Sequence, residues 1–337
     1  MGLRAALGPF SDRPWRKAMQ ARGASGSTVA RLWSYLNDPE RPQLAVEVRP
    51  GGIGVVRTRR AGGRAVLVSA ANVALSPDVV RPSLTQPNIA DAGAFRLALR
   101  AALERAGELQ GAPAALVLPD PVGRIALVPS AELPAARARE MDDLVLFRLR
   151  KSLPFDVREA RIAHARSPRA QDPVLTVAAL GSVVDAYEEA CRSVGLEPGL
   201  VELSALALCR AAFAPGAPGD RLLVNWDEGY ATLVLVRGGW PVLARTLTGP
   251  VVASPAEVAR EAAQTLLYAR ERLDSPGLEQ AVVRSVVMAP EEAVALLEGP
   301  LGIAPEPLDP WPALGTADAG PAGQALAGAA ACLAGAA

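Results

Sequence analysis

Few side chains in this chain of 337 residues could carry out catalysis. His164 is the single histidine, and an imidazole is the side chain that most readily acts as a general base near pH 7. No other His or Cys lies close to it in the sequence, and no Gly-x-Ser-x-Gly motif supplies a nucleophile. A single histidine also argues against a Ser–His–Asp triad. We therefore predict no catalytic residue, and keep His164 only as a minor candidate for a base.

The motifs that bind nucleotide phosphates are incomplete. Gly52 and Gly54 begin like a dinucleotide-binding loop, but Arg57 stands where the third glycine would be, so a hairpin turn is the better interpretation. The two lysines, Lys17 and Lys151, each follow an arginine, which excludes a Walker A loop.

Composition excludes further classes of protein. The cysteines Cys191, Cys209 and Cys332 lie far apart in apolar stretches without a CxxC or CxxH pair, which predicts three buried, reduced thiols and no metal site. The chain has 35 basic and 35 acidic residues, and this balance argues against binding nucleic acid by bulk electrostatics. No window reaches the roughly 18 apolar residues that a membrane span needs, so we expect a soluble protein.

The strands and helices that must position any site occur twice in the same order. Each copy predicts three strands joined by hairpins, then a helix, then an apolar strand. The first copy is predicted at 44–48, 53–58, 64–69, 91–107 and 114–118, and the second at 222–226, 231–236, 240–247, 254–273 and 282–288. We expect Asp91 to cap the first helix, and Ser254 with Glu257 to form a capping box on the second. In this alignment Glu47 matches Asn225.

A β-β-β-α-β unit present twice is the order expected of the two lobes of the actin/hexokinase/Hsp70 architecture. We therefore predict an α/β, duplicated actin-like (ribonuclease H-like) bilobed fold. The predicted parts are a basic, flexible arm at 1–43, a first lobe at 44–215 with an inserted subdomain at about 122–201, and a shortened second lobe at 216–337 with a C-terminal helix. Contact of the arm with anionic lipid through Trp15 and Trp33 is the alternative, which composition favours less.

The middle of the chain resembles PilM, the actin-like protein family of type IV pilus assembly, and more distantly the cytoplasmic part of type II secretion L proteins. The resemblance rests on the order and spacing of several short motifs. They are the Leu153-Pro154-Phe155-Asp156 turn, a strand at 174–180, Ala186-Tyr187, Gly195-Leu196-Glu197-Pro198 and the Ala205-Leu206-Ala207-Leu208 helix. It implies that a short tail of a PilN-like membrane protein binds between the first lobe's sheet and the inserted subdomain. Leu153, Pro154 and Phe155 are then the candidate contacts, although Phe155 could equally fill the subdomain's own core.

The resemblance also implies where ATP and Mg²⁺ would bind, and there this sequence departs from the family. Turns that cradle phosphates need backbone N–H groups and hydroxyls. The first turn instead has Glu47, Arg49 and Pro50, and Pro50 has no N–H to donate. The second turn has Asn225, Asp227 and Glu228, which places two carboxylates where a phosphate would approach.

Two further losses agree with a degenerate nucleotide site. Ala289-Pro290 replaces the adenosine-binding Gly-Gly of the family. Only about seven residues separate the third strand of the second copy from Ser254, where the family inserts a small subdomain. We therefore predict no bound cofactor.

These expectations combine into a non-catalytic cytosolic scaffold beneath the inner membrane, in a type IV pilus or type II secretion platform. Its predicted partner is the tail of a PilN-like protein, and a second copy of this chain is a further candidate partner. We expect the protein to associate with the membrane only through its partners. A nucleotide-binding actin-like ATPase of the same machinery is the alternative. An actin-like protein of cell division or cell shape is a weaker third interpretation.

Overall fold

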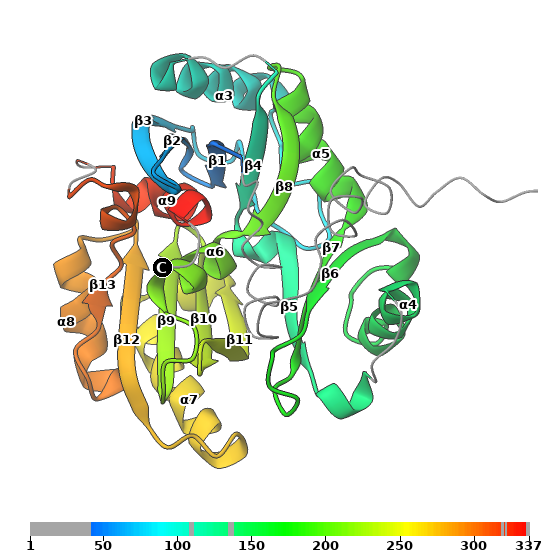
Figure 1. Cartoon of the computed structure of the whole chain (residues 1–337), viewed down its shortest axis with the longest axis vertical. Helices are drawn as coiled ribbons and strands as arrows, with labels where there is room; N and C mark the ends of the chain where they lie inside the picture. The colour runs from blue at the N-terminus through cyan, green and yellow to red at the C-terminus, as the bar shows by residue number, and fades with distance from the viewer. Residues whose placement is uncertain (1–41, 108–110, 134–137, 318–319, 321, 335–337) are drawn as a thin grey trace, which may run out of the picture. The chain divides into compact units, whose positions relative to one another are not determined.

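The computed structural model describes residues 42–107, 111–133, 138–317, 320 and 322–334. The predicted N-terminal arm therefore lies outside the described residues, apart from its last two. Figure 1 shows two sheets, each with helices packed against it, and a smaller third sheet beside the first.

The first lobe is built on a five-stranded sheet with the order β3-β2-β1-β4-β8. The strands are β1 (Leu44–Arg49), β2 (Gly52–Ala61), β3 (Arg64–Ala74), β4 (Pro113–Leu118) and β8 (Glu197–Leu203). β1 runs antiparallel to β2 and parallel to β4, so the hairpins form one side of the sheet and the parallel strands the other. The helices are α3 (Ala92–Ala106), α5 (Gly181–Arg192) and α6 (Ser204–Ala212). As predicted, Asp91 caps α3 by accepting a hydrogen bond from the Ala94 amide.

The second lobe repeats this arrangement in the order β11-β10-β9-β12-β13. Its strands are β9 (Asp220–Asp227), β10 (Tyr230–Arg237), β11 (Trp240–Thr248), β12 (Leu278–Ser285) and the short β13 (Glu306–Pro307). The helices are α7 (Pro255–Arg272), α8 (Pro290–Leu301) and α9 (Ala327–Ala334). Ser254 does precede α7, but its side chain makes no capping bond and Glu257 pairs with Arg260, so the predicted capping box is wrong.

The duplication extends to backbone angles in the second hairpin of each lobe. Gly62 and Gly63 have φ values of 58° and 81°, and Gly238 and Gly239 have 58° and 79°. Two successive residues with positive φ define the hairpin turn whose twist matches its strands, and glycine adopts them without strain. The duplicated actin-like order predicted from the sequence is confirmed.

The inserted subdomain is a three-stranded antiparallel sheet with one helix, and it is smaller than predicted. Its elements are β5 (Gly123–Val128), β6 (Ala160–Ala165), β7 (Val174–Leu180) and α4 (Ala138–Leu149). The predicted range of 122–201 extends too far, because α5 packs into the first lobe's core and β8 pairs with β4. Short 3₁₀ turns connect the remaining elements: η1 (Asp120–Val122), η2 (Ser130–Glu132), η3 (Val157–Glu159), η4 (Gly249–Ala253), η5 (Pro312–Leu314) and η6 (Gln324–Leu326).

The last helix of each lobe reaches towards the other lobe. α6 follows β8 of the first sheet but packs on β9 and β10, whereas α9 follows the second sheet but packs on β1, β2 and β4. The two helices also pack against each other, within an apolar cluster that draws residues from both lobes. Small side chains allow this close approach, since α9 reads Ala-Gly-Ala-Ala-Ala-Cys-Leu-Ala.

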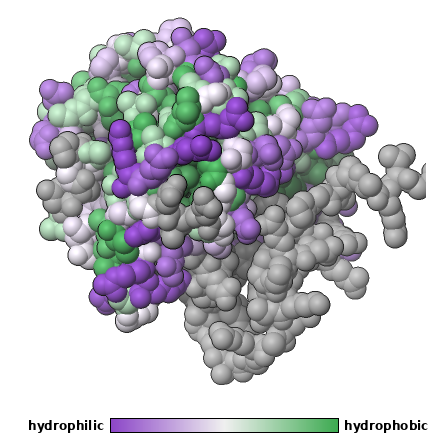
Figure 2. All heavy atoms as spheres, turned by 90° about the horizontal axis from the view of Figure 1, so that it is seen from above, coloured by the Kyte–Doolittle hydropathy of each residue, from purple (hydrophilic) through white to green (hydrophobic). Residues whose placement is uncertain are grey.

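The exposed apolar side chains are scattered over several elements. The large ones are Val68, Leu97, Phe147, Leu267, Tyr268 and Val287. On the face seen in Figure 2, hydrophobic and hydrophilic residues alternate in small patches. No helix among the described residues has the length and hydrophobicity required to span a lipid bilayer.

Candidate functional site

The candidate site lies between the lobes, where the first hairpins of the two sheets face each other. β1 and β2 are joined by Pro50 and Gly51, and β9 and β10 by Glu228 and Gly229. Each turn follows a buried strand, so the last inward side chains of β1 and β9 are directed into the middle of the protein. Glu47 and Asn225 occupy equivalent positions, each three residues before its turn, as the sequence alignment predicted.

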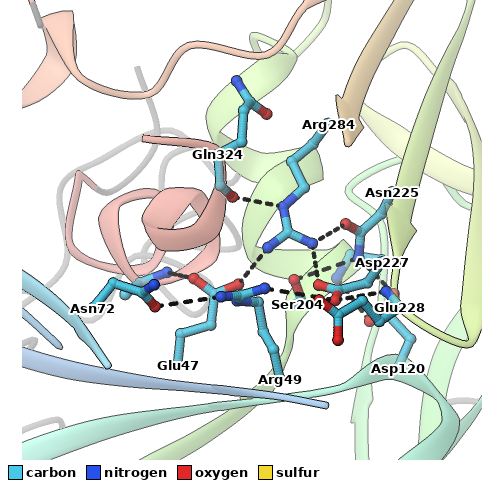
Figure 3. Close-up of polar contacts among 12 residues, drawn as sticks. Glu47, Arg49, Asn72, Asp120, Ser204, Asn225, Asp227, Glu228, Arg284 and Gln324 are labelled. Carbon is cyan, nitrogen blue, oxygen red and sulfur yellow. Dashed lines mark hydrogen bonds and ion pairs between the residues drawn. The ribbon is translucent and has the colours of Figure 1, made fainter. Parts of the chain in front are cut away.

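Arg284 is the centre of this site. It lies on β12 beside Asn225 and is fully buried. Its Nη2 donates to Glu47 Oε1 over 3.1 Å, and its Nη1 donates to Asn225 Oδ1 over 3.1 Å and to Asp227 Oδ2. Its Nε donates to the carbonyl oxygen of Gln324 over 2.9 Å. Figure 3 shows the guanidinium surrounded by these acceptors.

Two buried carboxylates lie at the first turns of the crossed helices. Glu47 Oε2 accepts from the Ala329 amide of α9 over 2.9 Å, and Asp120 Oδ1 accepts from the Ala205 amide of α6 over 2.8 Å. Free backbone N–H groups and the helix dipole favour negative charge at such positions. Asn225 connects the two halves, since its Nδ2 donates to Asp120 Oδ2 over 2.8 Å while its Oδ1 accepts from Arg284.

Burial controls the ionisation of these groups. It raises the pKa of Glu47 above its ordinary value, although Arg284 and Arg49 oppose the shift. Burial also raises the pKa of Asp120 to about 6, against the hydrogen bond from the Ala205 amide. For Arg284, burial alone would lower the pKa, but the carboxylates of Asp227 and Glu47 raise it, so the guanidinium stays charged.

The two turns touch each other. A Cβ atom added to Gly51 would lie 2.2 Å from Glu228 Oε1, so the glutamate side chain fills the space beside the first turn. Asp227 Oδ1 accepts from the Glu228 amide over 2.8 Å and lies 3.8 Å from Arg49 Nη1. Arg49 is buried and also donates to Asn72 Oδ1. The two turns therefore bring two carboxylates, together with the buried guanidinium of Arg49, into the space between them.

The structure thus brings together five of the six residues predicted at the degenerate turns, with Pro50 half-exposed at the edge of the group. Sequence reasoning missed Arg284 and Asp120. Each had a signal: Arg284 is a lone charge in the apolar run Ala-Val-Val-Arg-Ser-Val-Val, and Asp120 follows a fully apolar strand. A charge in such a place needs a partner.

A cavity of about 490 Å³ opens beside the turns. Its lining comes from the first turn, from the loop after β3 and from the second turn, and it includes Leu75, Val80, Pro121 and Tyr230. Asp78 and Glu228 contribute carboxylates to it. None of the predicted tail-binding residues lines this cavity.

The predicted tail-binding residues lie in the inserted subdomain. Leu153 belongs to that subdomain's buried core, Phe155 is half-buried against the same core, and Pro154 is exposed. His164 Nε2 lies 3.0 Å from Asp142 Oδ1 at the surface. The three cysteines are buried and form no disulfide with one another, as predicted. The described residues contain no cluster of His, Cys, Asp and Glu that could hold a metal ion.

The buried state of Asp120 predicts a pH-dependent stability. Its pKa of about 6 in the folded protein exceeds the ordinary 3.8, so folding favours the protonated form. Its contribution is therefore complete below pH 3.8 and is lost as the pH rises through 6, which amounts to about 3 kcal/mol. The free energy of unfolding of the wild type minus that of Asp120→Asn should fall by up to this amount between pH 4 and 7. A difference that rises with pH would show that the hydrogen bonds outweigh burial.

Gly328 predicts an unusual sensitivity within α9. Glycine-to-alanine changes inside helices usually stabilise, but a Cβ here would lie 2.5 Å from Glu47 Oε1, which is held by Arg284. We expect Gly328→Ala to lower the free energy of unfolding by about 1–3 kcal/mol in urea denaturation. Gly199→Ala is the control, because a Cβ there meets nothing within 4 Å and should change stability by less than about 1 kcal/mol. Equal effects of the two changes would contradict the tight fit around Glu47.

Comparison with known proteins identifies the fold. No family model and no curated protein matches the sequence. Among solved structures, a chain of the "PilM-PilN type IV pilus biogenesis complex" matches with a TM-score of 0.72 and 19% identity, over 87% of this chain and 97% of that chain. Two of the other matching structures have lower TM-scores. The cytoplasmic domain of EpsL of the Vibrio cholerae type II secretion system gives 0.45 at 11% identity over 72% of this chain and 81% of that chain. A Bacteroides thetaiotaomicron protein with an actin-like ATPase fold gives 0.49 at 7% identity over 82% and 93%. The chain therefore has the actin-like fold of the protein from the PilM–PilN complex.

Proposed function

We propose that this protein is a non-catalytic scaffold of a type IV pilus or type II secretion assembly platform, where it binds the cytosolic tail of a PilN-like inner-membrane protein. The similarity to a chain of the PilM–PilN complex supports the platform and the partner, because it extends over nearly the whole of both chains. In this proposal the protein works in the cytoplasm at the inner membrane, which it reaches through its partner. A second copy of the chain is a further candidate partner.

The observation that carries the non-catalytic part is the salt-bridged centre formed by Arg284, Glu47 and Asp227. In an actin-like ATPase the phosphates and Mg²⁺ would lie between the two turns, but here that space holds an internal guanidinium and carboxylates. A phosphate oxygen about 5 Å from a carboxylate is opposed by roughly 3 kcal/mol per pair of unit charges at an effective dielectric constant of about 20. The donor set therefore does not fit a magnesium nucleotide.

Two features of the second lobe support the same conclusion. β11 is followed directly by η4 and α7, which leaves no segment to cover a nucleotide from that side. Ala289 is the N-cap of α8 and Pro290 its first residue, so Pro290 offers no backbone N–H at this helix start. A nucleotide-binding ATPase of the same machinery is the rival function, and binding of ATP decides between them.

We expect no binding of Mg-ATP. Isothermal titration calorimetry of the full chain should show no heat of binding up to millimolar ATP, because Arg284 would have to be displaced and the carboxylates screened. ADP with Mg²⁺ is the parallel titration. A micromolar dissociation constant for either nucleotide would refute the non-catalytic proposal and favour the ATPase.

The tail of the PilN-like partner is expected to contact Phe155. A half-buried phenylalanine that becomes covered on binding removes about half of its surface from water and contributes roughly 1 kcal/mol, so Phe155→Ala should weaken the affinity about fivefold. The probe is a synthetic peptide of the cytosolic tail of the PilN-like protein from the same genome, and the readout is fluorescence anisotropy.

Two variants make this test specific. Phe147→Ala removes an exposed phenylalanine of the same subdomain and should leave binding unchanged. Leu153→Ala removes a core side chain and should cost about 2–5 kcal/mol of stability. If Phe155→Ala keeps its melting temperature and binds normally, the tail does not contact Phe155. If Phe155→Ala unfolds as Leu153→Ala should, Phe155 is a core residue.

A further inference from the structure

Arg284 connects parts of the protein that are far apart in sequence. Its side chain starts from β12 of the second lobe and reaches Glu47 on β1 of the first lobe, 237 positions away. It also contacts β9 through Asn225 and Asp227, and the C-terminal segment through the Gln324 carbonyl. One side chain therefore holds four segments of the chain together (Figure 3).

We propose that the centre of the protein is a guanidinium-binding site whose ligand, Arg284, is built into the chain and keeps the two lobes together without any bound cofactor. This inference goes beyond the scaffold function, because it concerns what holds the lobes and does not depend on which partner binds.

The geometry fits a planar cation. A guanidinium has five N–H donors in one plane, and Arg284 uses them in four hydrogen bonds to oxygen acceptors. Two of the acceptors, Glu47 and Asp227, are carboxylates from different lobes, and paired carboxylates suit guanidinium better than they suit a compact ammonium. The site is closed to water, since Arg284, Glu47 and Asp227 are all fully buried.

The acceptors are themselves fixed in position. Glu47 is held by the Ala329 amide, and Asp227 by the Glu228 amide. Glu47 also packs directly against Gly328, where a Cβ atom would lie 2.5 Å from Glu47 Oε1. Truncating Arg284 would therefore leave a cavity lined by two preorganised carboxylates, and such a cavity should accept a free guanidinium ion.

The lobes are also held by the apolar cluster around α6 and α9 and by contacts of the inserted subdomain, so loss of Arg284 should loosen them rather than separate them. The inserted subdomain contacts the β10–β11 hairpin of the second lobe, where Trp240 Nε1 donates to the Pro173 carbonyl over 2.8 Å.. Arg169 Nη2 donates to the Arg237 carbonyl over 2.5 Å at the same hairpin. These contacts lie outside the Arg284 site.

Distances between the lobes can test the proposal directly. Leu97 on α3 and Leu267 on α7 are exposed, so cysteines placed there can carry spin labels. The native thiols should stay unlabelled, because all three are buried and burial raises the pKa of Cys191 to about 12. Pulsed electron paramagnetic resonance then measures the distribution of distances between α3 and α7.

We expect a narrow distribution in the labelled wild type and a broader one in Arg284→Ala. Guanidinium chloride at millimolar concentration should narrow the distribution of Arg284→Ala and raise its melting temperature, relative to the same concentration of sodium chloride. The wild type should show no rise, since its site is filled. Arg245→Ala is the matched control: it removes an arginine whose ion pair with Glu261 lies within the second lobe, so guanidinium should not rescue it.

Two further variants cover the case in which Arg284→Ala does not fold. Arg284→Lys keeps the charge but cannot donate to both carboxylates in one plane, so it should be less stable than the wild type and gain nothing from guanidinium. If Arg284→Ala is insoluble, it can be refolded by dialysis. Dialysis into buffer with millimolar guanidinium chloride should recover folded protein, whereas dialysis into buffer with the same concentration of sodium chloride should not. The proposal would be overturned if guanidinium neither stabilised folded Arg284→Ala nor promoted its refolding. An unchanged distance distribution in Arg284→Ala would also overturn it. A finding that the protein binds no PilN-like tail would leave this test unaffected.

Discussion

The salt bridge between Glu47 and Arg284 is the constraint on which the arrangement of the lobes depends. Both groups are fully buried, and a buried charge without a partner costs several kcal/mol, so Glu47 of the first lobe depends on the arginine that the second lobe supplies, whereas Arg284 also pairs with Asp227 of its own lobe. The C-terminal segment takes part in the same interaction. The Gln324 carbonyl accepts a hydrogen bond from Arg284 Nε, and the Ala329 amide donates one to Glu47 Oε2. This explains why α9, made almost entirely of small residues, crosses to the first lobe instead of extending its own.

A buried ion pair is weak evidence of stability, since well-packed apolar residues can replace it without loss. Its value here is in specifying one geometry. Arg284 has acceptors on β1, β9 and η6, and a shift of any one of these elements would break a hydrogen bond in a medium where water cannot replace it. Asn225 donates to Asp120, and Asp120 accepts from the Ala205 amide at the start of α6. One polar network therefore contacts the first turns of both crossed helices.

Much of the fold could be predicted because its signals are local. Alternating and apolar runs located the hairpins, and Asp91 with Gly107 marked the ends of α3. β8 was missed because Pro198 and Gly199 interrupt its pattern, which an edge strand tolerates and a central strand would not. In the site, Glu47, Asn225 and Asp227 could be found by aligning the two turns. Arg284 could not be assigned a role, because its partners come from three distant segments and only the packed lobes bring them together.

The two lobes have the same topology, but they must differ in the residue at the position of Arg284. Glu47 pairs across the sheet with Val117, and Asn225, its counterpart, pairs with Arg284. The position of Arg284 in the second lobe is thus the position of Val117 in the first. Both positions face the same interior, so arginine at both would bring two guanidinium groups into one closed site, where like charges repel strongly at low dielectric. A duplicated sheet can place a charged centre between its copies only if one copy supplies the cation and the other keeps an apolar residue there.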